Sequence, residues 1–176
     1  FSLHQRGYRT KEHIAPLKEA LAAGLLLLSD WDRKTNLYDP MCGSGTILVE
    51  AAMMTQNIAP RLFSTKKFAI EKWENFDAML WKRVKKALKH QIEPSSTQIY
   101  GSDISPKFVQ MAKFSAKSAA VDDIITVEQA DFFTRKNSLN EGFIVSNPPY
   151  GERLKEEDIV TFYKEIGNTF KREYPG

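Results

Sequence analysis

The 176-residue sequence is poor in cysteine, histidine and long apolar runs. Its single cysteine, Cys42, can form no internal disulfide bond and favours a reducing, cytoplasmic setting. Three scattered histidines with one cysteine offer no metal-ligand spacing, so we expect no bound metal. No apolar run approaches the roughly 20 residues of a membrane span, and no secretory signal opens the chain. We therefore expect no membrane association.

An excess of charge of one sign is also missing, because 25 basic and 22 acidic side chains give a net charge of only +3. The basic residues nevertheless gather at 82–90 and near the start of the chain. A solvated helix face explains such a run by itself. The alternative is contact with nucleic-acid phosphates. The candidates for that contact are Arg6, Arg9, Lys82, Lys85 and Lys86.

Helix-like and strand-like segments alternate along the chain. Apolar spacing predicts helices over 16–28, 46–54, 74–90, 106–120 and 156–171. Short apolar segments predict strands at 37–39, 99–101, 124–128 and 143–145. This order predicts an α/β fold with a Rossmann-like, doubly wound, mostly parallel sheet. The segment 55–97 is expected to be an insertion before the second strand.

The residues after the first strand form a glycine turn. The segment Asp39 to Thr46 reads DPMCGSGT, and its two glycines, Gly43 and Gly45, let backbone approach a ligand closely. A plain tight turn has the same composition. The turn lacks the Lys-Ser/Thr pair of a Walker loop and the third glycine of a dinucleotide fingerprint. A nucleotide phosphate loop is therefore a poor fit.

Two further acids close the next strands at the same expected edge of the sheet, where parallel sheets bind ligands. Asp103 can accept hydrogen bonds from ribose hydroxyls, although it can also cap the helix that follows Ser105-Pro106. Asp131 can accept a hydrogen bond from an adenine amino group, with Phe132 against the ring. Solvation alone does not predict three strand-end acids, so their placement favours a nucleoside-containing ligand.

A second motif, Asn147-Pro148-Pro149-Tyr150, follows the last apolar strand. Its prolines lack N–H donors and leave carbonyl acceptors, and Asn147 adds a side-chain oxygen. Acceptors for both protons of a planar amino group polarise that group, while Tyr150 can stack on the base that carries it. The alternative is a simple turn after a strand.

Together these motifs resemble the class I S-adenosylmethionine-dependent methyltransferases with an Asn-Pro-Pro-Tyr motif. Segments 3–9, 15–19 and 58–60 narrow the resemblance to bacterial ribosomal RNA guanine methyltransferases that carry a THUMP domain before the catalytic domain. The resemblance implies S-adenosylmethionine as cofactor, S-adenosylhomocysteine as its product, and large-subunit ribosomal RNA as partner. It implies that Asn147, Pro148 and Tyr150 handle the target amine. The implied cofactor-binding residues are Pro16, Asp39, Pro40, Cys42, Gly43, Gly45, Asp103, Ile104, Asp131 and Phe132.

The resemblance also implies that residues 1–176 are one partial methyltransferase domain. The fold normally carries further C-terminal strands, and a fourth strand at the edge would leave an apolar edge bare. We therefore expect an upstream THUMP module and C-terminal strands outside this sequence. Three alternatives remain open: an adenine-specific DNA methyltransferase, a protein glutamine-amide methyltransferase, and a non-catalytic module that has kept the cofactor fold.

Overall fold

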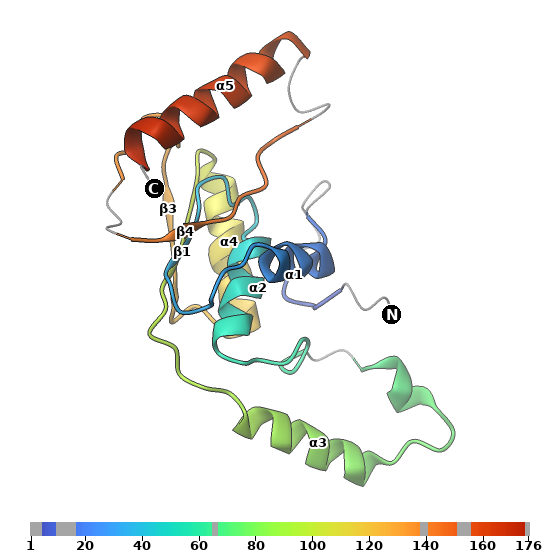
Figure 1. Ribbon diagram of the computed structural model, residues 1–176. Coiled ribbons are helices and arrows are strands. Elements are labelled where there is room, and N and C mark those ends of the chain that lie inside the picture. The colour runs from blue at the N-terminus through green and yellow to red at the C-terminus, as the bar shows by residue number, and fades with distance from the viewer. Residues whose placement is uncertain (1–4, 10–16, 65–66, 138–140, 151–155, 175–176) are drawn as a thin grey trace.

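The centre of the molecule is a four-stranded sheet in the spatial order β3-β2-β1-β4 (Figure 1). This computed structural model describes residues 5–9, 17–64, 67–137, 141–150 and 156–174. The strands are β1 (Leu37–Asp39), β2 (Ile99–Asp103), β3 (Ile125–Gln129) and β4 (Phe143–Ile144). All three strand pairings are parallel, so the predicted parallel α/β architecture is confirmed.

The described residues form five α-helices. These are α1 (Glu19–Leu28), α2 (Thr46–Thr55), α3 (Ala78–His90), α4 (Pro106–Ala119) and α5 (Glu156–Glu173). Two helices begin later than predicted. The helix expected from residue 16 begins at Glu19, and residues 10–16 lie outside the described part of the chain. The helix expected from residue 74 begins at Ala78, because the Asp77 side chain accepts the Leu80 N–H at 2.8 Å and caps the first turn.

One face of the sheet is covered by α2 and α4, and α1 packs on α2. Every residue from Thr46 to Met53 of α2 is buried in this arrangement. Gly101 in β2 allows the close approach, because a Cβ atom there would lie 2.3 Å from Leu48 Cδ1. The absence of a side chain at Gly101 therefore sets how near α2 comes to the sheet.

The C-terminal end of α5 packs beside the other face of β1. Successive strand residues point to opposite faces, so Leu37 joins the core around α2 while Tyr38 points away from it. The Tyr38 ring stacks on Tyr174 with a centroid separation of 6.1 Å. Phe132, after β3, contacts Phe170 at 5.3 Å. These contacts hold α5 beyond the end of the sheet (Figure 1).

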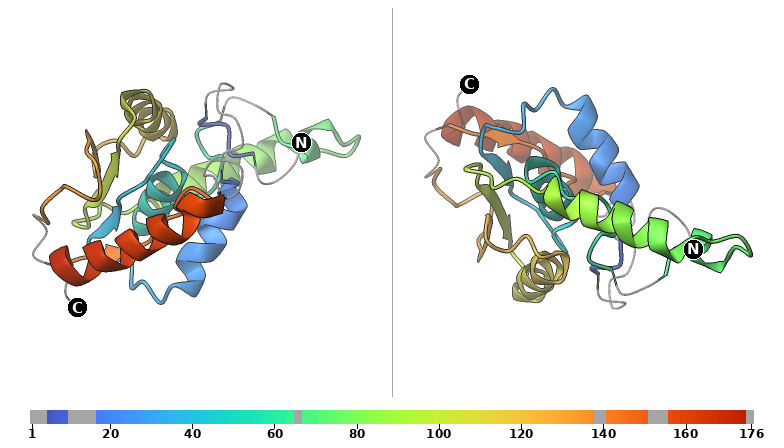
Figure 2. Two further views of the ribbon diagram at one scale, coloured as in Figure 1. Left: turned by 90° about the horizontal axis from the view of Figure 1, so that it is seen from above. Right: turned by 90° about the horizontal axis from the view of Figure 1, so that it is seen from below.

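The residues between α2 and β2 form a 3-10 turn, η1 (Ala69–Lys72), and α3. Both project away from the sheet in all three views of the ribbon (Figures 1 and 2). Within the described ranges, no helix combines the length and apolar character needed to cross a membrane.

Candidate active site

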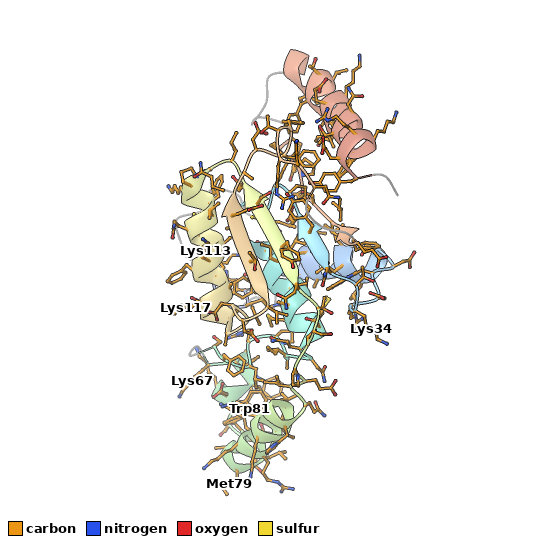
Figure 3. All side chains as sticks on the ribbon, turned by 90° about the vertical axis from the view of Figure 1, so that its left-hand side faces the viewer. Lys34, Lys67, Met79, Trp81, Lys113 and Lys117 are labelled. Carbon is orange, nitrogen blue, oxygen red and sulfur yellow. The ribbon has the colours of Figure 1, made fainter. Side chains whose placement is uncertain are left out.

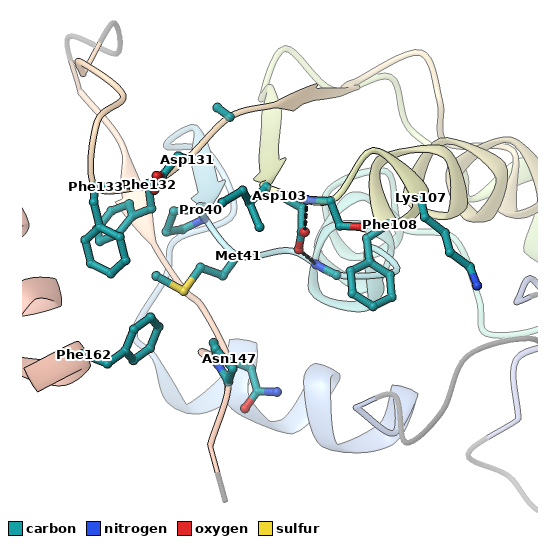
Figure 4. Close-up of a pocket in the computed structure, with 15 residues that line it drawn as sticks. Pro40, Met41, Asp103, Lys107, Phe108, Asp131, Phe132, Phe133, Asn147 and Phe162 are labelled. Atoms are coloured by element: carbon teal, nitrogen blue, oxygen red, sulfur yellow. Dashed lines mark hydrogen bonds between the residues drawn. The ribbon is translucent and has the colours of Figure 1, made fainter. Parts of the chain in front are cut away.

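A cavity of about 560 Å³ opens beyond the carboxyl ends of the strands (Figure 4). Its volume lies in the range of about 300–1,000 Å³ that is typical of small-molecule sites. The strand order reverses between β1 and β4, and such a switch point is where open parallel sheets bind ligands. The lining residues are Pro40, Met41, Gly43, Asp103, Ile104, Ser105, Lys107, Phe108, Ala130, Asp131, Phe132, Phe133, Asn147, Pro149 and Phe162.

Asp103 lines this cavity at the end of β2 and is held in a fixed orientation. The Gly43 N–H donates to Asp103 Oδ2 at 2.9 Å, and the Ser105 N–H donates to Oδ1 at 2.9 Å. The carboxylate thus helps start α4 and also reaches the cavity, so both predicted roles of Asp103 are compatible. Each oxygen keeps a further lone pair, which is what two ribose hydroxyls require.

The loop after β3 adds an acid and apolar surface to the same cavity. Asp131 Oδ1 accepts the Phe133 N–H at 2.9 Å, and the side chain lines the cavity. Phe132 is buried, with its ring centre 6.0 Å from that of Tyr174, and it also lines the cavity. Ile104, which is 66% exposed, also lines the cavity. An acceptor beside apolar side chains suits a flat heteroaromatic ring with an amino group.

Asp39 does not line the cavity but lies buried beneath it. Its Oδ1 accepts the Ser146 hydroxyl at 2.7 Å and the Met41 N–H at 3.2 Å. Burial raises the pKa of Asp39 to about 7, and nearby Asp103 adds to the rise, while both hydrogen bonds oppose it. Asp39 therefore ties the loop after β1 to the residue that precedes Asn147.

Two other residues of the predicted cofactor turn also lie outside the cavity lining. Cys42 is buried; burial raises the pKa of its thiol, and the charges of Asp39 and Asp103 raise it further. Gly45 has φ 78° and packs against α4, where an added Cβ would lie 2.9 Å from the Ala112 Cβ. From this turn, Pro40 and Gly43 reach the cavity as expected.

The Asn-Pro-Pro-Tyr motif is split between the cavity and the surface. Asn147 and Pro149 line the cavity, whereas Pro148 and Tyr150 do not. Tyr150 is 61% exposed. The fold thus brings Asn147 to the same cavity as Asp103 and Asp131, and it leaves the Tyr150 ring open to solvent beside that cavity.

The two arginines expected at an RNA surface are engaged by carboxylates instead. Arg6 Nε lies 3.4 Å from Glu50 Oε1, and Arg9 Nη2 lies 3.4 Å from Glu19 Oε2. Both carboxylates are buried, and the Tyr8 hydroxyl also donates to Glu50 at 2.9 Å. These ion pairs hold the N-terminal segment to α1 and α2. Pro16, the remaining predicted cofactor residue, lies outside the described residues.

Several lining residues were not found from the sequence. Phe108 occupies the first turn of α4, five residues after Asp103, and its position close to a strand end was a usable signal. Phe162 comes from α5, and its ring contacts Phe133 at 5.5 Å. Nothing in the sequence indicates that α5 folds back over the strand ends. Ser146, the partner of Asp39, was missed for a similar reason.

Comparison with known proteins identifies the domain. The model of the UPF0020 family, the RMKL-like methyltransferase domain, matches residues 6–176. The chain belongs to this family. The ribosomal RNA large subunit methyltransferase K/L of Shewanella baltica is 40% identical over an alignment of 181 positions. The alignment covers 99% of this chain and 25% of that protein. The chain thus spans about a quarter of the length of the curated relatives it matches.

Solved structures agree with this assignment. The structure of SMU.472 complexed with SAH superposes with a TM-score of 0.87 and is 37% identical, covering 97% of this chain and 45% of that one. A Listeria monocytogenes protein named as a predicted N6-adenine-specific DNA methylase has a TM-score of 0.84 and 38% identity, with the same coverage. Both likenesses extend over nearly the whole chain and therefore support the methyltransferase fold.

Proposed function

We propose that this chain is the catalytic domain of an enzyme that methylates an exocyclic amino group in RNA with S-adenosylmethionine. The proposed target is a guanine of large-subunit ribosomal RNA, which would make the enzyme cytoplasmic. One observation carries the proposal: Asn147 lines the same cavity as Asp103 and Asp131. An amine-binding group and a nucleoside-binding pair thus share one site. The name of the Shewanella baltica relative supports the RNA substrate.

The cavity fits the proposed cofactor. Asp103 would accept the ribose hydroxyls, because both of its oxygens are oriented by backbone N–H groups and border the cavity. Asp131 would accept the adenine amino group, with Ile104 and Phe132 against the ring. The SAH bound to SMU.472, which is 37% identical, supports a cofactor of this class.

When bound, S-adenosylmethionine supplies a methyl group on a positively charged sulfur. The residues of this chain position the acceptor and stabilise developing charge. The Asn147 side-chain oxygen and the Pro148 carbonyl would accept the two amine protons, while Tyr150 would stack on the base. A strong base is not needed before transfer, because the amine proton becomes acidic only as the new N–C bond forms. The positions of Asn147 at the cavity and Tyr150 beside it suit these roles.

The substrate is tested with the complete enzyme and radiolabelled cofactor. Large-subunit ribosomal RNA transcribed in vitro, genomic DNA and a protein fraction are offered separately, and labelled nucleosides are then identified. We expect label in the RNA, as guanine methylated on its exocyclic amino group. Label confined to protein or DNA would overturn the proposed substrate.

The site is tested by variants that should affect either methyl transfer or cofactor binding. Asn147→Ala should slow methyl transfer by about two to three decades, equivalent to about 2.7–4 kcal/mol, with unchanged SAH affinity. Asp103→Ala should weaken SAH binding by about 1.5–3 kcal/mol. Asn147→Asp keeps the acceptor and should retain more activity than Asn147→Ala. Wild-type turnover by Asn147→Ala would show that the proposed chemistry is wrong.

A second candidate is methylation of adenine in DNA. The name given to the Listeria monocytogenes structure, which is 38% identical, favours it. The same cavity and the same acceptor at Asn147 would serve an adenine amino group. The nucleoside analysis separates the candidates, since methylated adenine in the DNA fraction would select this one.

A further inference from the structure

The helix α3 is an exposed element that the cavity and its chemistry do not use. None of its residues is buried, and it projects from the body in every ribbon view (Figures 1 and 2). Figure 3 shows Trp81 and Met79 at the end of the molecule away from α5. Phe162 of α5 lines the cavity, so α3 lies remote from the site of chemistry.

The charge on α3 has one sign. Its 13 residues include five lysines and arginines and no aspartate or glutamate. Lys82, Lys86 and Lys89 are all exposed, and their spacing of four and three residues places them on one face of the helix. Among the described residues, four ion pairs occur and none includes a residue of α3. This face, hereafter the α3 lysine face, therefore presents three cations to solvent.

The helix is also fixed at both ends, so this face has a defined position. At its start, Trp81 packs edge-on against Phe68 at 5.2 Å, and the Arg61 guanidinium lies 4.2 Å over the Phe68 ring. At its end, the Asn57 side chain donates to the Gln91 carbonyl at 2.9 Å. Anchored cations bind a polyanion with less loss of conformational freedom than cations on a mobile tail.

Not every basic residue of the helix belongs to this face. Lys85 is only half-exposed, with its ammonium 5.6 Å from the centre of the Trp81 ring. Its position fits a cation–π contact with Trp81 one turn earlier in the same helix. Lys85, like Arg6 and Arg9, is therefore committed to contacts within the chain.

We propose that the α3 lysine face binds the phosphodiester backbone of the RNA substrate at a site separate from the cavity. The proposal rests on the proposed function for the identity of the polyanion. Lysine makes point-charge contacts with phosphate that carry no sequence information, so this surface would position RNA and leave base choice to the cavity. An RNA bound at both places must extend along the molecule from α5 to α3.

The experiment uses the complete enzyme and large-subunit ribosomal RNA transcribed in vitro. Lys82, Lys86 and Lys89 are replaced together by glutamine, and RNA affinity is measured over a range of salt concentrations. Each phosphate contact contributes about 0.7–0.9 to the slope of log affinity against log salt, so the slope should fall by about 2–3. At physiological salt, RNA binding should weaken about tenfold or more.

A matched control replaces three other exposed lysines, Lys34, Lys113 and Lys117, with glutamine (Figure 3). It removes the same charge and should leave most of the slope intact. SAH affinity, measured for both triple variants, verifies that the cavity is unchanged. If the triple variant does not fold, Lys82→Gln/Lys86→Gln replaces it, with an expected fall in slope of about 1.4–1.8.

The outcomes separate this proposal from the proposed function. Equal slopes for the α3 and control variants, with RNA still methylated by the wild type, would overturn the α3 surface alone. Failure of the wild type to methylate any RNA would overturn the proposed function instead. Unchanged RNA binding with weakened binding of a polyglutamate peptide would assign the face to an acidic protein and refute an RNA surface.

Discussion

The helices α2 and α3 are close in length but differ sharply in burial and in charge. Of the ten residues in α2, the eight from Thr46 to Met53 are buried, whereas none of the 13 residues in α3 is. The only charged residue of α2, Glu50, is paired with Arg6 and Tyr8 inside the protein. The lysines and arginines of α3 mostly face water.

The difference shows that the two helices are stabilised in different ways. An isolated helix shorter than about 12–15 residues is marginal in water. The sheet, α1 and α4 surround α2, so its stability comes from burial. In contrast, α3 depends on the Asp77 cap and on the aromatic contacts of Trp81. We therefore expect the body of the domain to determine global stability and α3 to open locally at lower cost.

Substitutions in the buried helix α2 should destabilise the protein most. Leu48→Ala removes a side chain that is 1% exposed and packed on Gly101, and it should lower the free energy of unfolding by about 2–5 kcal/mol. Denaturant titration of the wild type and the variant measures this loss. A loss of unfolding free energy below about 1 kcal/mol would contradict the expectation that packing of α2 stabilises the core.

Buried and exposed carboxyl groups should also differ in how they make stability depend on pH. Burial raises the pKa of Asp39 from its ordinary value of 3.8 to about 7. Between these two pH values the folded protein keeps the Asp39 proton, whereas the unfolded chain has lost it. The stabilisation that comes from this protonation is therefore complete below about pH 4 and is lost as pH rises to about 7. Over that interval the wild type should lose on the order of 3 kcal/mol of unfolding free energy, and Asp39→Asn should abolish this loss.

The control for this prediction is Asp32, which is fully exposed. Backbone hydrogen bonds from Thr35 and Lys34 lower its pKa, so its contribution has the opposite sign and is lost as pH falls. Unfolding free energies measured from pH 2 to pH 8 for wild type, Asp39→Asn and Asp32→Asn cover both contributions, because that of Asp32 changes only below about pH 4. Parallel curves for wild type and Asp39→Asn would contradict the assigned role of burial at Asp39.

The smallest effect is expected on the exposed side. Leu80→Ala in α3 changes a side chain that is 52% exposed, and it should alter the free energy of unfolding by less than about 0.5 kcal/mol. The same denaturant titration applies, with Leu48→Ala as the reference. A loss as large as that of Leu48→Ala would show that α3 is buried against another part of the protein in solution.

The sequence predicted the sheet and the convergence of residues from separate strand ends for one physical reason. Parallel strands place their carboxyl ends at one edge, so residues that follow separate strands must converge there. Asp103, Asp131 and Asn147 were found by this rule, and all three line the cavity. Strand alternation and helix spacing are local signals, which explains why the elements were predicted more accurately than their contacts.

The rest depends on contacts between distant residues that leave no local signal. Arg6 was expected at a surface, but its partner Glu50 lies 44 residues away in α2. The role of Gly45 is set by Ala112 of α4, and Phe162 reaches the cavity only because α5 folds back. Apolar spacing predicted the helix α3 correctly, yet Leu80 and Val84, two of its apolar residues, remain exposed.

The buried state of Cys42 has a practical consequence for chemical labelling. The thiolate is the form that reacts with maleimides, and burial together with Asp39 and Asp103 raises the pKa of this thiol. Within these 176 residues, the native cysteine should therefore react slowly at neutral pH and can stay in place. A Met79→Cys substitution, at a position that is 73% exposed, would then take up a fluorophore selectively. Such a dye on α3 would report nearby changes in real time while the cavity keeps its natural sequence.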